Sequence, residues 1–455
     1  MSEVNSKNIK RLMPCLLILF ILANLMVQAF VTVSPAIAQD FDISASMVSM
    51  VVTMSTIVLG VCSVIYGALS DYIPVKKLLV FGIGMFIFGT LIGLIFQKIF
   101  VMIVIARAVQ TIGQAAMSSL YLVIASRYLE GNEKVRYFAY FTASFQIAQA
   151  LGVLAGGIIA TYISWEMLFV ISLVAIFFAP AVIRYAPVED TMGERKKIDF
   201  IGLLLFSALI VVMTLLLNKM SLNLLLAEII IVVIFLLYIA KNENAFITPR
   251  FFSENKKYTK AILTVFAVYL CQFVFAFLYT FIVNGMYENS LDLVSYILLP
   301  GYIMAAFVGG IGDKIVHRLG RYKTVVTGII MIIAGLLMTA FFMDQGKLVL
   351  SFSAILFFVG YNTLYSPMLD SVIGTLPEQE LGRGIGLNDL TINISSSFGV
   401  AIGGRLMVTA ALNKVQFLPV NASLNIYGNI MLIFAAIAFI SLLLFIKHMK
   451  GFYQE

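Results

Sequence analysis

Long apolar runs are the feature that most limits how this chain can fold. Leu12–Ala38, Val101–Ser126 and Ile426–Ile446 are each mostly apolar. A helix that rises 1.5 Å per residue needs about 20 such residues to cross a hydrocarbon core roughly 30 Å thick. Only 12% of the 455 residues are charged, against roughly 25% in a soluble domain. The pattern therefore predicts an all-α protein that crosses a membrane many times.

The apolar runs also predict a topology. A sliding window indicates fourteen spans, an even number that places both termini on one side. Of the 30 Lys and Arg residues, 24 fall in the segments that share a side with the N-terminus, and short cytoplasmic loops carry such an excess. We therefore expect a multi-pass plasma-membrane protein with both termini in the cytoplasm. The predicted spans are 12–38, 46–69, 76–97, 100–126, 137–162, 165–185, 199–218, 222–240, 258–284, 292–311, 323–343, 347–375, 384–410 and 426–447.

The remaining composition argues against several other classes of protein. The formal charge of +7 arises from these loops, so it reflects topology and predicts no nucleic-acid partner. Cys15, Cys62 and Cys271 are isolated within apolar runs, a pattern that predicts neither a disulfide framework nor a metal site. No nucleotide-binding loop of the Gly-x-x-x-x-Gly-Lys-Ser/Thr type occurs in the sequence. We expect no cofactor.

One short motif occurs twice. Gly67–Asp71 is followed by Lys76 and Lys77, and Gly309–Asp313 is followed by Arg318. Both copies read Gly-x-x-x-Asp with a basic residue five positions later, and each lies between the second and third spans of a block of six. The repeat predicts two six-helix bundles related by an axis along the membrane normal, as in transporters that rock about a midplane cavity.

The first copy resembles motif A of the major facilitator superfamily, roughly Gly-x-Leu-x-Asp-Arg-x-Gly-Arg-Arg. Arg107–Ala116, which reads RAVQTIGQAA, is similar to the family's motif B. With fourteen predicted spans and Asp199–Gly202 opening the seventh, the whole chain resembles the fourteen-helix drug:proton antiporters, including tetracycline and multidrug efflux proteins of Gram-positive bacteria. Three positions depart from that pattern: Gly152–Gly157 lacks the motif C proline, Glu166 replaces an Arg, and the first span has no acid.

The resemblance implies the major facilitator fold, here two six-helix bundles with two extra central helices. The N-terminal bundle would span residues 1–186, the extra helices and their loops 187–257, and the C-terminal bundle 258–455. The two repeated motifs would latch the halves together on the cytoplasmic side. The latch residues implied are Gly67, Asp71, Lys76, Lys77, Gly309, Asp313 and Arg318.

Ionisable side chains at membrane depth are costly, so each is a candidate for the mechanism. Arg107, Gln110 and Gln114 fall at i, i+3 and i+7 on one stripe of the fourth span. Gln146 and Gln149 of the fifth span could hydrogen-bond to this stripe. In the functional interpretation, Arg107 couples protonation to the shape of a cavity. In the structural interpretation, helix-end carbonyls satisfy it.

Four acidic residues are further candidates for proton coupling. Glu166 and Glu228 fall near the outer interface, where they could simply reach water. Asp370 and Asp389 flank one loop symmetrically, so we expect similar depths in a helix hairpin, where two close carboxylates cannot easily both ionise. Asp389 is the preferred proton carrier. The alternative is that either aspartate pairs with Arg383 or interacts with a helix end.

Aromatic and amide side chains recur within the spans. Such faces suit flat amphipathic organic molecules, through stacking and cation–π contact, better than sugars or inorganic ions. For any one aromatic residue, ordinary packing is the alternative. The candidate substrate-binding residues are Gln28, Phe30, Gln114, Gln146, Gln149, Tyr269, Gln272, Phe273, Tyr361, Asn362, Tyr365 and Asn393.

These features predict secondary active efflux of amphipathic drugs or toxic organic compounds by proton antiport with alternating access. The alternative on the same fold is proton-coupled uptake or export of a nutrient or metabolite. A membrane enzyme or channel is disfavoured, because His317 and His448 both fall in cytoplasmic segments and no filter-like loop is present. We expect a monomer whose partners are a small organic substrate, protons and membrane lipid.

Overall fold

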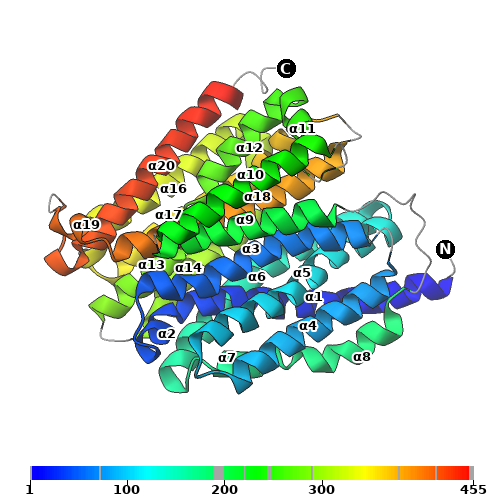
Figure 1. Cartoon of the computed structure of the whole chain (residues 1–455), viewed down its shortest axis with the longest axis horizontal. Coiled ribbons are helices and arrows are strands. Elements are labelled where there is room, and N and C mark those ends of the chain that lie inside the picture. Colours follow the sequence, from blue (N-terminus) through cyan, green and yellow to red (C-terminus); the bar gives the residue numbers. More distant parts are fainter. Residues whose placement is uncertain are drawn as a thin grey trace.

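The computed structural model describes residues 3–70, 73–187, 199–219, 221–242, 245, 247–287, 290–377, 380–415 and 418–449, and these fold almost entirely into helices. Two groups of helices meet at one end of the molecule and diverge at the other, where both termini lie (Figure 1). The helices are α1 (Glu3–Thr32), α2 (Ser34–Asp40), α3 (Ala45–Leu69), α4 (Val75–Ile95), α5 (Phe100–Tyr128), α6 (Gly131–Tyr162), α7 (Met167–Ser172), α8 (Ala175–Tyr185), α9 (Phe200–Lys219), α10 (Leu222–Lys241), α11 (Pro249–Glu254), α12 (Lys256–Tyr269), α13 (Gln272–Met286), α14 (Leu291–Gly310), α15 (Gly312–Leu319), α16 (Arg321–Phe342), η1 (Met343–Gln345), α17 (Lys347–Ile373), α18 (Leu381–Met407), α19 (Ala410–Lys414), η3 (Ala422–Leu424) and α20 (Asn425–Met449).

Twelve helical stretches among the described residues are long and apolar enough to cross a membrane, so the predicted number of fourteen is wrong. Both predicted spans that are not among the twelve are nevertheless helical. Within 199–218, the apolar helix covers only Ile201–Leu217, shorter than the roughly 20 residues of a full span. Within 384–410, α18 is 27 residues long, but polar residues such as Asn388, Asp389 and Asn393 interrupt its apolar character.

One predicted span, 258–284, is divided into α12 and α13 by a break at Leu270 and Cys271. Two carbonyl groups beside the break have partners on other helices. The Tyr361 hydroxyl of α17 donates to the Val268 carbonyl at 2.6 Å, and Ser396 Oγ of α18 donates to the Tyr269 carbonyl at 3.3 Å. A broken helix is tolerated at membrane depth when neighbouring helices supply such partners. The break therefore fixes α17 and α18 against α12.

The helices pack as two groups. The first contains α1 and α3–α8, and the second contains α12–α14, α16–α18 and α20. The helices α9 and α10 pack on each other, and α9 also contacts α3 and α18. Two helix pairs provide the main contacts between the groups, α3 with α18 and α6 with α14.

The α3–α18 contact is close at one end and absent at the other. A Cβ on Gly404 would lie 3.0 Å from Ser49 Cβ, and a Cβ on Gly60 would lie 2.9 Å from Asn393 Cβ. Two turns further along the same antiparallel register, Gly67 and Gly386 have no atom within 4 Å of an added Cβ. We call the end near Gly404 the closed end, and the end near Gly386, which also carries the termini, the open end.

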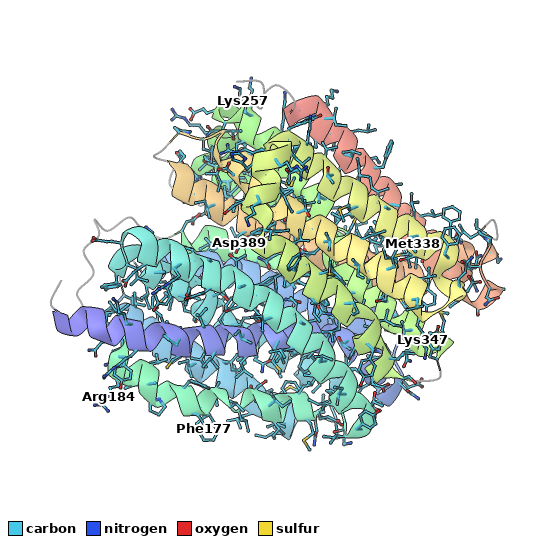
Figure 2. The ribbon with its side chains drawn as sticks, turned by 180° about the vertical axis from the view of Figure 1, so that it is seen from behind. Phe177, Arg184, Lys257, Met338, Lys347 and Asp389 are labelled. Atoms are coloured by element: carbon cyan, nitrogen blue, oxygen red, sulfur yellow. The ribbon has the colours of Figure 1, made fainter. Side chains whose placement is uncertain are left out.

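The α6–α14 contact is likewise made at the closed end. Ser295 Oγ donates to the Val153 carbonyl at 2.5 Å, and the Tyr162 hydroxyl donates to Asp292 Oδ2 at 3.2 Å. A glycine is required here, because a Cβ on Gly157 would lie 1.9 Å from Ser295 Oγ. The two groups therefore form a V whose apex is the closed end (Figures 1 and 2).

Candidate functional site

Asp389 of α18 lies near the middle of the molecule, where the two groups begin to diverge (Figure 2). Its side chain is exposed, and the ion pairs formed among the described residues leave its carboxylate unpaired. Asn393, one turn later, donates from Nδ2 to the Asp389 carbonyl at 2.9 Å and packs on Gly60 of α3. An unpaired carboxylate at membrane depth is energetically costly, so Asp389 is a candidate for function.

Asp370 has a different environment. Its Oδ2 lies 2.9 Å from Arg321 Nη1 of α16, and both side chains are more than half exposed. The carboxylate predicted to share a hairpin with Asp389 is thus already paired with a base on another helix. An exposed pair of this kind contributes roughly 0–1 kcal/mol to stability. Arg383, the other predicted partner, instead donates to the Ala245 carbonyl and to Thr248 Oγ1.

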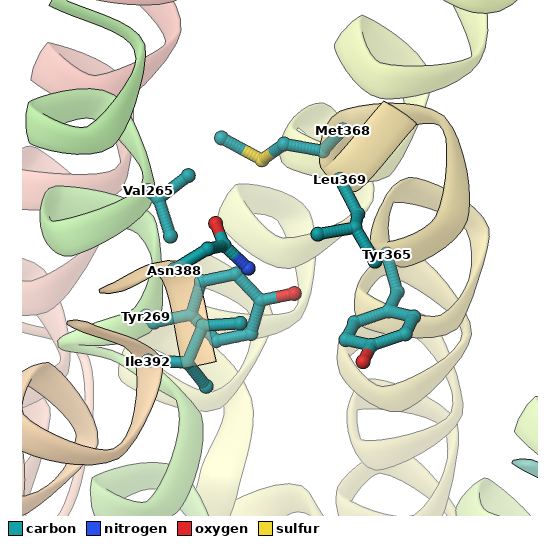
Figure 3. Close-up of a pocket in the computed structure, with 7 residues that line it drawn as sticks. All are labelled: Val265, Tyr269, Tyr365, Met368, Leu369, Asn388 and Ile392. Atoms are coloured by element: carbon teal, nitrogen blue, oxygen red, sulfur yellow. The ribbon is translucent and has the colours of Figure 1, made fainter. Parts of the chain in front are cut away.

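A narrow hollow, with no room for a water molecule, is lined by Asn388, the residue before Asp389. Side chains from α12, α17 and α18 face one another across it (Figure 3). Tyr365, which is 42% exposed, lies within electrostatic reach of Asp389. The lining residues of the hollow are Val265, Tyr269, Tyr365, Met368, Leu369, Asn388 and Ile392.

The structure brings some of the predicted aromatic and amide residues to this hollow and buries others in packing. The Tyr269 ring lies 5.5 Å from the Tyr361 ring, whose hydroxyl is used at the helix break. Asn362 Nδ2 donates to the Ala305 carbonyl at 2.6 Å, and Gln272 Oε1 accepts from Ser396 Oγ at 3.1 Å. Phe273 is half-buried. Of the predicted set, Tyr269 and Tyr365 line the hollow.

In the first group, Arg107 is buried, and no carboxylate among the described residues pairs with it. It donates from Nη1 to Gln110 Oε1, as the predicted stripe allows, and its guanidinium carbon lies 4.4 Å from the centre of the Phe30 ring. Gln110 Nε2 donates at 2.9 Å to both Thr90 Oγ1 of α4 and Ser172 Oγ of α7. Arg107 Nε has no partner. The network ties four helices together around a cation that water does not reach.

The glutamines predicted to link the fourth and fifth spans have other environments. Gln114 Nε2 donates to Asn24 Oδ1 of α1 at 3.2 Å rather than to α6. Gln149 Nε2 and both polar side-chain atoms of Gln28 are buried without hydrogen-bond partners, and Gln146 is half-buried. Although α5 and α6 contact each other, α1 packs against both helices, and its Asn24, rather than Gln146 or Gln149, provides the acceptor for Gln114.

The other two acids lie away from the hollow. Glu166 precedes α7 and is half-buried, and its Oε2 has no hydrogen-bond partner. Glu228 of α10 is 4% exposed, and neither of its carboxylate oxygens has a hydrogen-bond partner. Glu228 shares a helix stripe with Phe235 and Ile239, the other buried side chains of α10. Nothing in these contacts joins either acid to Asp389.

The predicted latch residues lie at the open end. Asp71 is outside the described residues. Gly67 borders open space, Lys76 is half-buried, and Lys77 is exposed. Gly309 contacts Asn362, whereas Asp313 and Arg318 are exposed on α15.

Arg127 makes a contact at the open end that the sequence did not predict. It donates from Nη1 to the Ser70 carbonyl at 2.8 Å and from Nη2 to Ser70 Oγ at 3.0 Å. Arg127 thereby fixes the end of α3 to the end of α5 within one group. Nothing in the sequence indicated this contact, because a count of the Lys and Arg residues in the loops does not identify their hydrogen-bond partners.

Two groups of membrane helices that share two interfaces, close at one end and open at the other, define a polytopic secondary transporter. Residues 16–400 match the family described as "Major Facilitator Superfamily". This chain belongs to the major facilitator superfamily, a family of transporters rather than enzymes.

Known relatives are distant but match at nearly full length. The chain is 23% identical over 418 residues to the quinolone resistance protein NorB of Staphylococcus aureus (strain MRSA252), covering 89% of each chain. It is 24% identical over 427 residues to the riboflavin transporter RibZ of Clostridioides difficile (strain 630), covering 92% of each. Among solved structures, the nucleoside transporter NupG has a TM-score of 0.65 at 12% identity, covering 96% of this chain and 99% of NupG. The peptide transporter POT in complex with sulfate has a TM-score of 0.69 at 12% identity, covering 96% of this chain and 95% of POT. The solved structures show the shared fold alone.

Proposed function

We propose that this chain exports amphipathic aromatic compounds across the plasma membrane in exchange for protons. The observation that carries the proposal is the unpaired Asp389 carboxylate, exposed between the two helical groups and beside an aromatic-lined hollow. The relative that confers quinolone resistance supports a drug substrate. The distribution of Lys and Arg supports a cytoplasmic location for both termini. With that orientation, the open end faces the cytoplasm.

Alternating access supplies the mechanism. In the inward-facing arrangement, Asp389 releases its proton to the cytoplasm and the compound binds. The groups then tilt, the closed end opens, and a proton from outside replaces the compound at Asp389. One proton that moves inward through 100 mV in exchange for a neutral compound contributes about 2.3 kcal/mol, which supports a concentration gradient of roughly fiftyfold.

The moving units are residues 1–186 and 258–455, with 187–257 between them. In the outward-facing state, the latch residues would meet as the open end closes: Gly67, Asp71, Lys76 and Lys77 from one half, and Gly309, Asp313 and Arg318 from the other. Arg107 keeps the first half rigid as the proton moves. The two interfaces between the groups, α3 with α18 and α6 with α14, allow each bundle to tilt as a whole against the other.

The test uses everted membrane vesicles with an acidic lumen and a fluorescent amphipathic dye. Vesicles with the unsubstituted chain should accumulate the dye, and Asp389→Asn should reduce the pH-driven rate at least about tenfold, because the neutral amide cannot exchange a proton. Asp370→Asn is the matched control and should retain the rate. The proposal is contradicted if dye accumulation does not depend on the pH gradient, or if the rate in Asp389→Asn is unchanged.

A second candidate function is proton-coupled transport of a nutrient or metabolite. The relative described as a riboflavin transporter favours it. The direction of transport separates the two candidates, because cells that express an exporter accumulate less labelled compound than control cells, and cells that express an importer accumulate more. A panel of cationic, zwitterionic and neutral antimicrobials, with riboflavin included, would identify the compound class.

A further inference from the structure

The start of α18, the helix that carries Asp389, has a low intrinsic helix propensity. Gly382, Gly384 and Gly386 fall among its first six residues. One glycine in a helix interior lowers the helical population about fivefold relative to alanine. Gly386 has no atom within 4 Å of an added Cβ, so close packing does not require a glycine there. The first turns of α18 therefore need contacts from elsewhere in the protein to stay helical.

The segment between α10 and α12 supplies such contacts to Arg383. This residue donates from Nη2 to the Ala245 carbonyl at 3.3 Å and to Thr248 Oγ1 at 3.1 Å. Its guanidinium carbon also lies 4.6 Å from the centre of the Phe251 ring of α11, a cation–π contact. Arg383 is half-buried. One arginine thereby joins the start of α18 to three points of the segment.

A second contact leads back to the next residue of α18. The Phe251 ring lies edge-on to the Tyr258 ring of α12, with 5.4 Å between the ring centres. Tyr258 is fully buried, and its hydroxyl donates to the Gly384 carbonyl at 2.8 Å. The contacts thus run from Arg383 through two rings to Gly384 and close a loop. We call these four residues, Arg383, Phe251, Tyr258 and Gly384, the clamp.

We infer that the clamp positions Asp389, and that Arg383 is its central positioning residue. Asp389 lies six residues after Arg383, about 9 Å along the helix axis, with Gly384 and Gly386 between them. Unwinding of these turns would remove the rigid support of the carboxylate. Because Ala245 packs against α10, the clamp also ties α9 and α10 to the helix of the proton carrier. This inference rests on the proposed function, in which Asp389 exchanges the proton.

Hydrogen exchange in the purified full-length chain tests the clamp without a transport measurement. Arg383→Met removes the guanidinium contacts and keeps a side chain of similar helix propensity. The amides of residues 385–389 should then exchange at least about fivefold faster, and those of α16 should keep their original rate because the rest of the chain stays folded. Arg250→Met is the matched control, since Arg250 lies on α11 and its side chain is 80% exposed. Unchanged exchange at 385–389 in Arg383→Met overturns the inference.

Helix propensity separates loss of the clamp from a general loss of stability. Gly386→Ala added to Arg383→Met should slow the exchange at 385–389 about fivefold, because alanine favours the helix and has space at this position. Gly84→Ala should not slow it, although Gly84 is likewise an exposed helical glycine without neighbours, on α4. Equal recovery with both alanines, or recovery with neither, contradicts the inference.

A double-mutant comparison tests whether Arg383 acts through Asp389. Arg383→Met alone should lower the pH-driven dye rate several-fold and leave the KM for the dye within about twofold. In the Asp389→Asn background it should lower the rate no further, because the carboxylate that it positions is gone. Equal fractional losses in both backgrounds would show a merely structural role and overturn the inference. An unchanged rate in Asp389→Asn alone contradicts the proposed function instead, and hydrogen exchange then decides the clamp separately.

Discussion

The two ends of the molecule differ in how the helical groups meet. At the closed end, Gly157 and Gly404 bring backbones so close that an added Cβ would lie within about 3 Å of the other group. At the open end, Gly67 and Gly386 occupy the same register of α3 and α18 but have no neighbour within 4 Å. The interface is therefore a packed hinge region at one end and separated surfaces at the other. A shift of packing from one end to the other would expose Asp389 to the opposite side of the membrane.

A covalent link across the closed end should have the largest effect. With Cys15 and Cys62 replaced by Ala, the pair Ser49→Cys and Gly404→Cys brings two Cβ atoms about 3.0 Å apart, a few tenths of an ångström short of disulfide geometry. Oxidation should nearly abolish transport in vesicles, and reduction should restore it, because the closed end can no longer open.

The control for this link lies within one group. A Cβ on Gly156 would lie 2.9 Å from Thr32 Cβ, both in the first group. The oxidised Thr32→Cys and Gly156→Cys pair should transport normally. If the link between the groups and the link within one group have equal effects, the groups do not move against each other at the closed end.

Steric pressure at the closed end should have a smaller effect. In Gly157→Val, a Cβ 1.9 Å from Ser295 Oγ and 2.4 Å from the Leu291 carbonyl would push α6 and α14 apart. The open end should then close more often, and maleimide labelling of Gly386→Cys should slow several-fold. Gly285→Val, an exposed glycine with no atom within 4 Å, should leave the labelling rate unchanged. Faster labelling in Gly157→Val would contradict the hinge.

Asp370→Asn should change transport by less than about twofold. Its exposed pair with Arg321 lies within the second group and makes no contact across the interface, and such pairs are worth little. Initial rates in vesicles measure the effect. A loss as large as that of Asp389→Asn would mean that the two aspartates act together, as the hairpin prediction proposed.

The smallest expected effect concerns a surface pair at the open end. Lys10 Nζ lies 2.7 Å from Glu133 Oε1, and both side chains are about half exposed. The hydrogen bond from Lys10 lowers the pKa of Glu133. The pair therefore contributes at neutral pH, and its contribution is lost as the pH falls through that lowered pKa.

The measurement is the thermal midpoint of Glu133→Gln in detergent. At neutral pH it should lie within about 1 °C of the unsubstituted chain, and the difference should vanish in acid. A large difference at neutral pH would show that this pair, which joins α1 and α6 of the same group, is part of a stabilising network.

Some of the site could be predicted because it depends on periodicity along one helix. Arg107 and Gln110 are three residues apart, so they share a face wherever α5 lies, and they do contact each other. The partner of Gln114 could not be found in this way, because helical spacing does not identify which helix lies opposite. Asn24 of α1 provides it. The same reason explains why Arg127 and its Ser70 contact were missed.

The number of spans was mispredicted because a hydropathy window measures the composition of a segment and not its position relative to lipid or to other helices. The polar series on α18 lies between the two groups, where water and the partner helix α3 can accommodate it. Asn388 was overlooked for a related reason. It adjoins Asp389 in the sequence, and only the packing of α12 and α17 shows that its amide oxygen is enclosed without a donor.

The sequence by itself determined that this chain is a multi-pass helical membrane protein of the major facilitator superfamily, because burial in lipid requires long apolar helices and the repeated motif follows from two similar halves. The tertiary structure decided which polar groups are paired. Among the described residues, Asp370 has a base beside it and Asp389 has none, although the two are symmetric about one loop. Pairing depends on distances between helices, which local sequence does not fix.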